Sequence, residues 1–101
     1  MLYSIEYHEK VFDDIKKLKL TKNQLYKLKY KIENIARNPY PKSHGGLGEP
    51  LSGNLKGLLK FRFLNDYRVV YKILKEDDAV KIIVIGLRRD MLVYNMAVKR
   101  K

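Results

Sequence analysis

Three β-type runs, separated by short polar turns, constrain the fold of this chain more than any other feature. The runs cover residues 58–64, 67–74 and 79–86. Strands joined by such tight turns pair antiparallel with their neighbours in the sequence. The third run contains four consecutive apolar residues, 82–85, which indicates burial on both faces. The second half of the chain therefore predicts an antiparallel meander.

The first half predicts one strand followed by two helices. Residues 2–7 alternate in polarity, and the apolar positions of residues 9–19 recur at helical spacing. Thr21 can cap a second helix, with Gln24 completing a capping box, and this helix should end before Pro39. We expect the two helices to form a hairpin packed on one face of an antiparallel sheet.

The remaining segments complete a single small domain. Residues 38–57 hold all three prolines and five of the six glycines, which predicts a loop. A short helix is expected over residues 91–99, after the last strand. The predicted class is α+β, in the order βαα–βββ–α, and the length indicates one domain over residues 1–101.

The composition limits the partners and the chemistry. Lys and Arg number 22 against 11 Asp and Glu, so the net charge is +11. Such a charge favours nucleic acid, an acidic protein or an anionic membrane surface as a partner, although it can also serve solubility alone. The absence of cysteine excludes disulfides, thiolate metal sites and thiol catalysis. No apolar run approaches the ~20 residues that span a bilayer, and we expect no membrane association.

Alternation along the predicted strands places several cations on one sheet face. Lys60 and Arg62 point away from their apolar neighbours, and Arg68 points the same way from the next strand. We expect these three side chains to meet on the face that the helices leave open. Arg88 could reach the rim of this face, and the last helix would bring Tyr94 to the same edge. A solvated sheet face also carries alternating charge, but this one has almost no acidic compensation.

Three stretches carry a resemblance to a known family. They are PLSGNLKGLLKFRF at residues 50–63, DYRVVY at 66–71, and VIGLRRD at 84–90 with Tyr94 after it. Together with the opening strand and the first helix, they resemble the RelE/ParE toxin superfamily over nearly the whole chain. The resemblance implies a single RelE-like domain with a microbial-RNase-like fold.

The resemblance implies the toxin of a type II toxin–antitoxin pair. Toxins of the RelE branch enter the ribosomal A site and cleave mRNA there, by attack of a ribose 2′-hydroxyl on the adjacent phosphate. Matched by position, the working residues are Lys60, Arg62, Arg68, Arg88 and Tyr94. The ParE branch is the alternative, since its members are not nucleases and poison DNA gyrase. An inactive relative that only binds an antitoxin or nucleic acid is a third reading.

The chemistry of RNA cleavage suggests a role for each residue. Arg68 and Arg88 could pair with the phosphate oxygens, and Tyr94 could stack on a base. Lys60 is the candidate base, provided that clustered positive charge lowers its pKa. Arg62 is always protonated and is the better electrostatic partner. His8 and His44 lie on different predicted elements, so we assign them surface roles. No acidic pair has metal-site spacing, and we expect neither a metal nor a cofactor.

A second set of cations is expected to hold RNA or the ribosome. Phosphate contacts of this kind give affinity without sequence choice, although a solvated helical face is the simpler explanation of the helical lysines. The expected residues are Lys16, Lys17, Lys27, Lys31, Lys56 and Arg89. We also expect an acidic, partly disordered RelB-like antitoxin that folds on contact and masks the cations. The expected location, with ribosome and mRNA as partners, is the cytoplasm.

Overall fold

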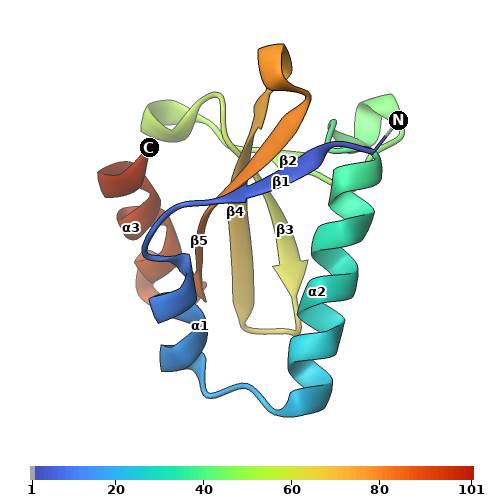
Figure 1. Ribbon diagram of the computed structural model, residues 1–101. Coiled ribbons are helices and arrows are strands. Elements are labelled where there is room, and N and C mark those ends of the chain that lie inside the picture. Colours follow the sequence, from blue (N-terminus) through green and yellow to red (C-terminus); the bar gives the residue numbers. More distant parts are fainter. Residues whose placement is uncertain (1) are drawn as a thin grey trace.

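The computed structural model describes residues 2–101, and Met1 lies outside them. Its centre is one sheet in the order β1-β5-β4-β3-β2, which Figure 1 shows between the helices. The strands are β1 (Ser4–Tyr7), β2 (Glu49–Pro50), β3 (Leu59–Phe63), β4 (Tyr67–Leu74) and β5 (Ala79–Leu87). The helices are α1 (Val11–Leu18), α2 (Lys22–Arg37) and α3 (Leu92–Arg100). The α+β class and the predicted element order are confirmed, with the short strand β2 added.

The sheet is mixed, which corrects the expectation of a purely antiparallel one. The meander of β3, β4 and β5 is antiparallel, as predicted. Strand β1, however, pairs parallel with β5, from Ser4 opposite Ala79 to Tyr7 opposite Ile82. Because two helices separate β1 from the meander, the chain can return beside β1 in the same direction. The sequence spacing contains no information about which edge of the meander β1 joins.

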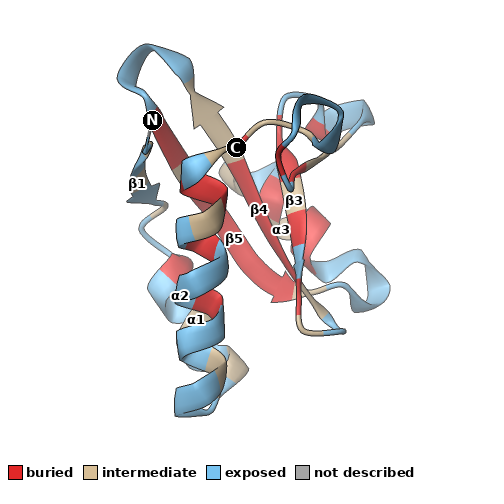
Figure 2. Ribbon diagram, turned by 90° about the vertical axis from the view of Figure 1, so that its right-hand side faces the viewer, coloured by how far each residue is buried: buried red, intermediate tan, exposed pale blue. Residues whose placement is uncertain are grey.

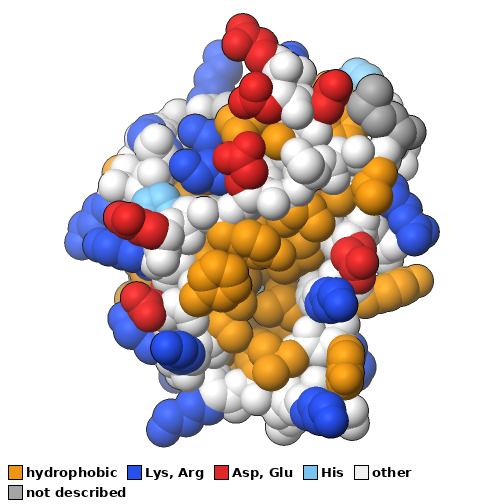
Figure 3. Space-filling model, in the orientation of Figure 1, with side chains coloured by type: hydrophobic (Ala, Val, Ile, Leu, Met, Phe, Trp, Pro, Cys, Tyr) orange, Lys and Arg blue, Asp and Glu red, His pale blue; other side chains and the backbone are white. Residues whose placement is uncertain are grey.

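Helices α1 and α2 cover one face of the sheet, as expected. Their apolar residues, such as Val11 and Ile32, pack with Phe61, Phe63 and Tyr71 of the strands. The two helices splay apart along their length (Figure 1). Apolar side chains gather in the middle of this face, and Lys and Arg side chains lie around them (Figure 3). The helical hairpin is therefore present, but it does not close over the whole face.

The opposite face is not left open, which corrects the second expectation about the sheet. Val93, Tyr94 and Ala97 of α3 pack against Val70 and Val84 of the sheet, and Leu55 and Leu58 join this second cluster. Strand β5 is consequently buried over most of its length (Figure 2). The run 82–85 accordingly lies between two apolar layers, as its composition predicts.

The start of α2 follows from its local sequence. Thr21 accepts a hydrogen bond from the Gln24 backbone N–H, and the Gln24 side chain accepts one from the Thr21 N–H. This reciprocal capping box satisfies two of the donors that a helix leaves free at its N-terminus. Helix α2 ends at Arg37, just ahead of Pro39, as predicted.

An ion pair fastens α3 to the rest of the domain. The guanidinium of Arg100 contacts the buried Asp14 carboxylate of α1 through two hydrogen bonds, of 2.6 and 2.8 Å. The same carboxylate accepts from the Ile85 N–H, and Arg100 donates to the Ile83 carbonyl. These two backbone groups lie on β5 beyond Ile82, where pairing with β1 ends. The ion pair therefore satisfies the edge of β5 that β1 leaves uncovered.

None of the helices over residues 2–101 is both long and apolar enough to cross a membrane.

Candidate functional site

The predicted cations of β3 and β4 lie on the α3 face of the sheet. Phe61 and Phe63 point to the helical hairpin, so Lys60 and Arg62 between them point the other way. Arg68 lies directly opposite Arg62 in the strand register. Alternation along the strands therefore brings these three residues to one region, as predicted.

A carboxylate, an ammonium and a phenol meet at the end of this region. The Lys60 Nζ lies 3.4 Å from the Tyr94 hydroxyl and 5.7 Å from the centroid of its ring. The same Nζ lies 3.8 Å from a carboxylate oxygen of Glu49. Glu49 belongs to β2 and pairs directly with Lys60 in the sheet. Three segments far apart in the sequence thus form one cluster, which we call the Glu49–Lys60–Tyr94 cluster.

Glu49 was not among the predicted site residues. Its other carboxylate oxygen accepts a hydrogen bond of 3.0 Å from the Lys42 Nζ. This bond, with the added charges of Lys42, Lys60 and Arg62, lowers the Glu49 pKa below its ordinary value of 4.5. Glu49 is the only acidic residue between Glu33 and Asp66. A single acidic residue in so long a stretch is a signal by which the sequence could have marked Glu49 as a candidate. The sequence could not show that a two-residue strand would bring Glu49 to Lys60.

Tyr94 is held rigidly in the cluster. Its side chain is only 8% exposed and belongs to the second apolar layer, and its hydroxyl reaches Lys60. The ring therefore has little free surface for an added base to stack on. What it presents to a ligand is the polar end beside Lys60.

Arg68 is buried to a greater extent than a surface cation on an open face would be. It is 7% exposed, and its Nη1 donates to the backbone carbonyls of Asn65 and Tyr67. One guanidinium nitrogen is thus bound to the β3–β4 turn. Arg62 opposite is exposed and contributes its positive charge to the surroundings of Glu49.

Arg88 lies at the far end of β5, apart from the Glu49–Lys60–Tyr94 cluster. Its backbone N–H donates to the Asp66 carbonyl, and its side chain is exposed. Together with Arg89 it lines a separate hollow of about 350 Å³ beside the β3–β4 turn. Across residues 2–101, no hydrogen bond or ion pair joins the Arg88 side chain to the cluster.

The residues predicted to hold RNA or the ribosome are all exposed, but they do not form one patch. Lys16 and Lys17 lie on α1, Lys27 and Lys31 on α2, Lys56 after the turn at Gly53–Leu55, and Arg89 after β5. Lys17 lines a hollow with residues of α3, including Lys99. Lys31 lies elsewhere and donates to the Arg62 carbonyl at 2.7 Å.

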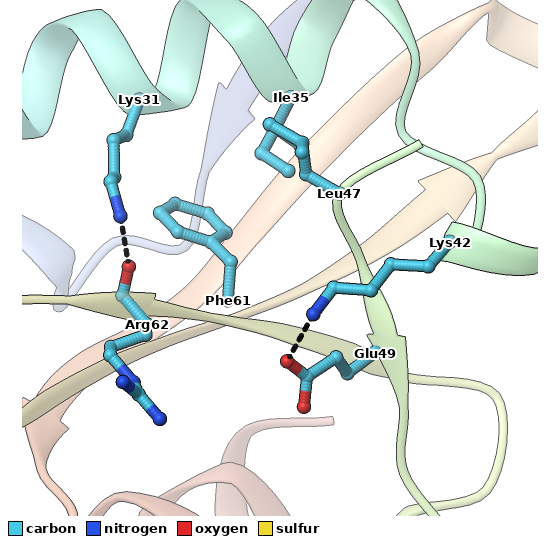
Figure 4. Close-up of a pocket in the computed structure, with 7 residues that line it drawn as sticks. All are labelled: Lys31, Ile35, Lys42, Leu47, Glu49, Phe61 and Arg62. Carbon is cyan, nitrogen blue, oxygen red and sulfur yellow. Dashed lines mark hydrogen bonds and ion pairs between the residues drawn. The ribbon is translucent and has the colours of Figure 1, made fainter. Parts of the chain in front are cut away.

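A cleft of about 340 Å³ opens between α2 and the β3 edge, next to the cluster (Figure 4). Figure 4 shows Phe61 and Ile35 in the cleft, with Lys31 above and Lys42 reaching Glu49 from the side. Arg62 points to the other side of β3. The cleft thus combines an apolar floor with cations at its rim.

The histidines take no part in this arrangement. The Nδ1 of His8 accepts from the Lys10 N–H, and His44 is exposed beside Ser43. Within the described part of the chain, no three His, Asp or Glu side chains lie close enough to hold a metal ion.

The sequence matches a family of known proteins. Residues 5–92 match the model of a family described as the ParE toxin of type II toxin–antitoxin system, parDE. No curated protein is similar enough in sequence to be matched.

Solved structures share the fold. A double arginine-to-alanine variant of E. coli toxin RelE in the free state is 26% identical, with a TM-score of 0.77 over 99% of this chain and 98% of that one. The same variant in complex with an antitoxin RelBc peptide is 25% identical, with a TM-score of 0.70 over 100% and 99%. A YoeB/ParE toxin from Agrobacterium tumefaciens is 23% identical, with a TM-score of 0.69 over 84% and 98%.

The family match covers residues 5–92, which include Glu49 and Lys60 but not Tyr94, and the free RelE variant matches 99% of this chain. Together they bear out the resemblance to RelE and ParE toxins. The chain is a toxin of a type II toxin–antitoxin system and belongs to the ParE toxin family.

Proposed function

We propose that this toxin is an endoribonuclease that cleaves mRNA in the ribosomal A site. The observation that carries the proposal is the Glu49–Lys60–Tyr94 cluster with Arg62 beside it. It combines a proton acceptor, a proton donor and a fixed positive charge, which are the three groups that internal attack on a phosphodiester requires. Acting on mRNA at the ribosome places this protein in the cytoplasm.

The proposed reaction is attack by a ribose 2′-hydroxyl on the neighbouring phosphorus. The Glu49 carboxylate is ionised at neutral pH, lies beside Lys60, and takes the proton of the 2′-hydroxyl. The 2′-oxygen bonds to phosphorus, the bond to the 5′-oxygen breaks, and the Lys60 ammonium protonates the leaving oxygen. The products are a 2′,3′-cyclic phosphate and a 5′-hydroxyl. A proton passing from Glu49 to Lys60 restores the site without a metal.

The remaining residues support this exchange. Arg62 is exposed and free to pair with the phosphate oxygens, while Arg68 adds positive charge from beneath. Tyr94 fixes the position of the Lys60 ammonium. Arg88, with Arg89, holds the RNA at the other end of the strands. This assignment makes Lys60 the acid instead of the base, because the group beside it that is unprotonated at neutral pH is Glu49.

A ribosome-dependent cleavage assay with mapping of the cut sites tests the proposal. Glu49→Gln and Lys60→Met should each lower the cleavage rate by about 10²–10⁴-fold, the usual contribution of general acid–base catalysis. Glu76→Gln, the same change at an exposed glutamate of the β4–β5 turn, is the control and should cut at the rate of the unchanged protein. Cutting by Glu49→Gln at the rate of the unchanged protein would rule out this role for Glu49.

The ParE branch supplies a second candidate function, because the matching family model is that of ParE toxins. In this case the chain binds and poisons DNA gyrase and leaves mRNA intact. A supercoiling assay with purified gyrase distinguishes the two. Inhibition of gyrase without message cleavage would favour the ParE function, and cleavage without gyrase inhibition would favour the nuclease.

Solved complexes of similar toxins support an antitoxin partner. They include the intact E. coli RelBE toxin–antitoxin complex and the archaeal RelE–RelB complex from Pyrococcus horikoshii. We propose that the antitoxin of this chain is acidic, because a net charge of +11 favours an acidic partner. Its binding would mask the cations around Glu49 and so stop the activity.

A further inference from the structure

Two exposed tyrosines on α2 have no role in the fold or in the proposed chemistry. Tyr26 and Tyr30 are each 61% exposed and lie one helical turn apart, on the same side of α2. With Lys27, Lys31, Phe63 and Leu64 they line a hollow of about 320 Å³. That volume is at the lower end of the range of about 300–1,000 Å³ that small-molecule sites occupy. Exposed aromatic rings that line a hollow of this size indicate a ligand-binding site.

The hollow continues directly from the candidate site. Lys31 lines it and also lines the cleft of Figure 4, which contains Glu49 and Arg62. At the boundary the Lys31 Nζ donates to the Arg62 carbonyl and so joins α2 to the edge of β3. The two hollows thus adjoin at the Lys31 side chain, and a chain molecule that passes Glu49 can cross this side chain to reach the tyrosines.

The lining residues favour a single-stranded nucleic acid over a protein segment. The hollow offers aromatic rings and two lysines and contains no acidic side chain. Proteins hold single strands in this way, with bases stacked on aromatic rings and cations along the backbone. Lys42 extends the same positive charge along the cleft to Glu49.

We infer that the Tyr26–Tyr30 hollow binds a base of the RNA strand, outside the cutting site, while Lys27 contacts the adjoining phosphate. The inference rests on the proposed nuclease function, since it extends the path of the same strand. The hollow would contribute affinity and hold the strand in place, and the chemistry would stay at Glu49 and Lys60.

The test uses RNA that cannot be cut, so that binding is read separately from cleavage. A fully 2′-O-methylated octanucleotide lacks the attacking hydroxyl, and its affinity for the purified toxin is measured by fluorescence anisotropy. Tyr26→Ala/Tyr30→Ala should weaken binding by about 5- to 150-fold, the loss expected for one stacked base. Tyr26→Phe/Tyr30→Phe keeps the rings and should bind like the unchanged protein. Equal affinity for the alanine variant and the unchanged protein would overturn the inference.

A second measurement locates the site. Backbone amide shifts of residues 26–31 and 63–64 should move on addition of the octanucleotide and stay in place with a 2′-O-methylated dinucleotide, which reaches only the cutting site. Lys27→Met should reduce the slope of log affinity against log salt by about 0.7, the value for one phosphate of a single strand. Lys29→Met, on the same helix but outside the hollow, should leave the slope unchanged.

The outcomes separate this inference from the proposed function. A toxin that binds the octanucleotide through the tyrosines but leaves ribosome-bound message intact would contradict the proposed nuclease function and support RNA binding in the hollow. If the toxin cuts message and the alanine variant binds RNA normally, the nuclease function is supported and the inference that the hollow binds RNA is wrong. If the alanine variant instead loses affinity for the antitoxin alone, the hollow is a protein-docking surface and the inference is wrong.

Discussion

The free backbone groups at the two sides of the sheet are satisfied in opposite ways. At the β5 side, where β1 stops, the buried pair of Asp14 and Arg100 bonds the free backbone groups and holds α3 in place. At the β3 side, β2 covers only Leu59 and Lys60, and the next outward carbonyl, that of Arg62, is bonded by an exposed lysine. The first end is closed by this buried ion pair, and the second is open and has exposed tyrosines and lysines beside it. Rigidity and ligand access are thus assigned to different edges of one small domain.

Breaking the closed end should have the largest effect. Asp14→Ala leaves the Arg100 guanidinium buried without a counter-charge, and we expect a loss of about 3–5 kcal/mol in the free energy of unfolding. Urea denaturation measures this loss. The neighbouring Asp13→Ala, at an exposed position of the same helix, should stay within about 0.5 kcal/mol of the unchanged protein. If both variants were equally stable, the ion pair would not be what closes this end.

A gentler change at the same pair should loosen α3 selectively. Arg100→Lys keeps the charge but loses the two-pronged contact with Asp14, and we expect a cost of about 1–3 kcal/mol. Amide hydrogen exchange should become faster in α3, which carries Tyr94, and should stay the same in α2. Uniformly faster exchange in both helices would mean that the two ends are coupled more tightly than the contacts indicate.

At the open end, α2 depends on its own capping for part of its stability. Thr21→Ala removes the side-chain acceptor of the capping box and should cost about 1 kcal/mol. Thr21→Ser retains the hydroxyl and should restore most of that stability. Thermal unfolding, followed by circular dichroism, tests the pair. A larger loss than for Arg100→Lys would reverse the ranking of the two ends.

The smallest expected effect is a shift in pH dependence. The hydrogen bond from Lys42 lowers the Glu49 pKa, so the ionised form persists below pH 4.5 and its stabilisation is lost only as the pH falls through the folded-state value. Lys42→Met should therefore raise the Glu49 pKa and move the acidic limb of the cleavage rate to higher pH. Titration of the Glu49 carboxyl carbon by NMR measures the shift. Lys72→Met, two strands away from Glu49 in the sheet, should leave it unchanged.

The local sequence pattern was sufficient to predict those features that depend only on neighbouring residues. Alternation placed Lys60 and Arg62 on one side of β3 and Phe61 on the other, because successive side chains of any strand point to opposite faces. The start of α2 at Thr21 followed from two hydrogen bonds within four residues. The family match then showed that these strands belong to a toxin of known fold.

Contacts between distant segments were beyond such reasoning. Whether α3 would cover the second face depends on the direction in which the chain leaves β5. The meeting of Glu49 with Lys60 depends on a strand of only two residues, too short for any periodicity. The sequence by itself determined the strands, the helices and the sign of the charge, since these follow from near neighbours and composition. The tertiary structure alone decided which charges meet and which edge stays open, because both depend on how segments far apart in the chain pack together.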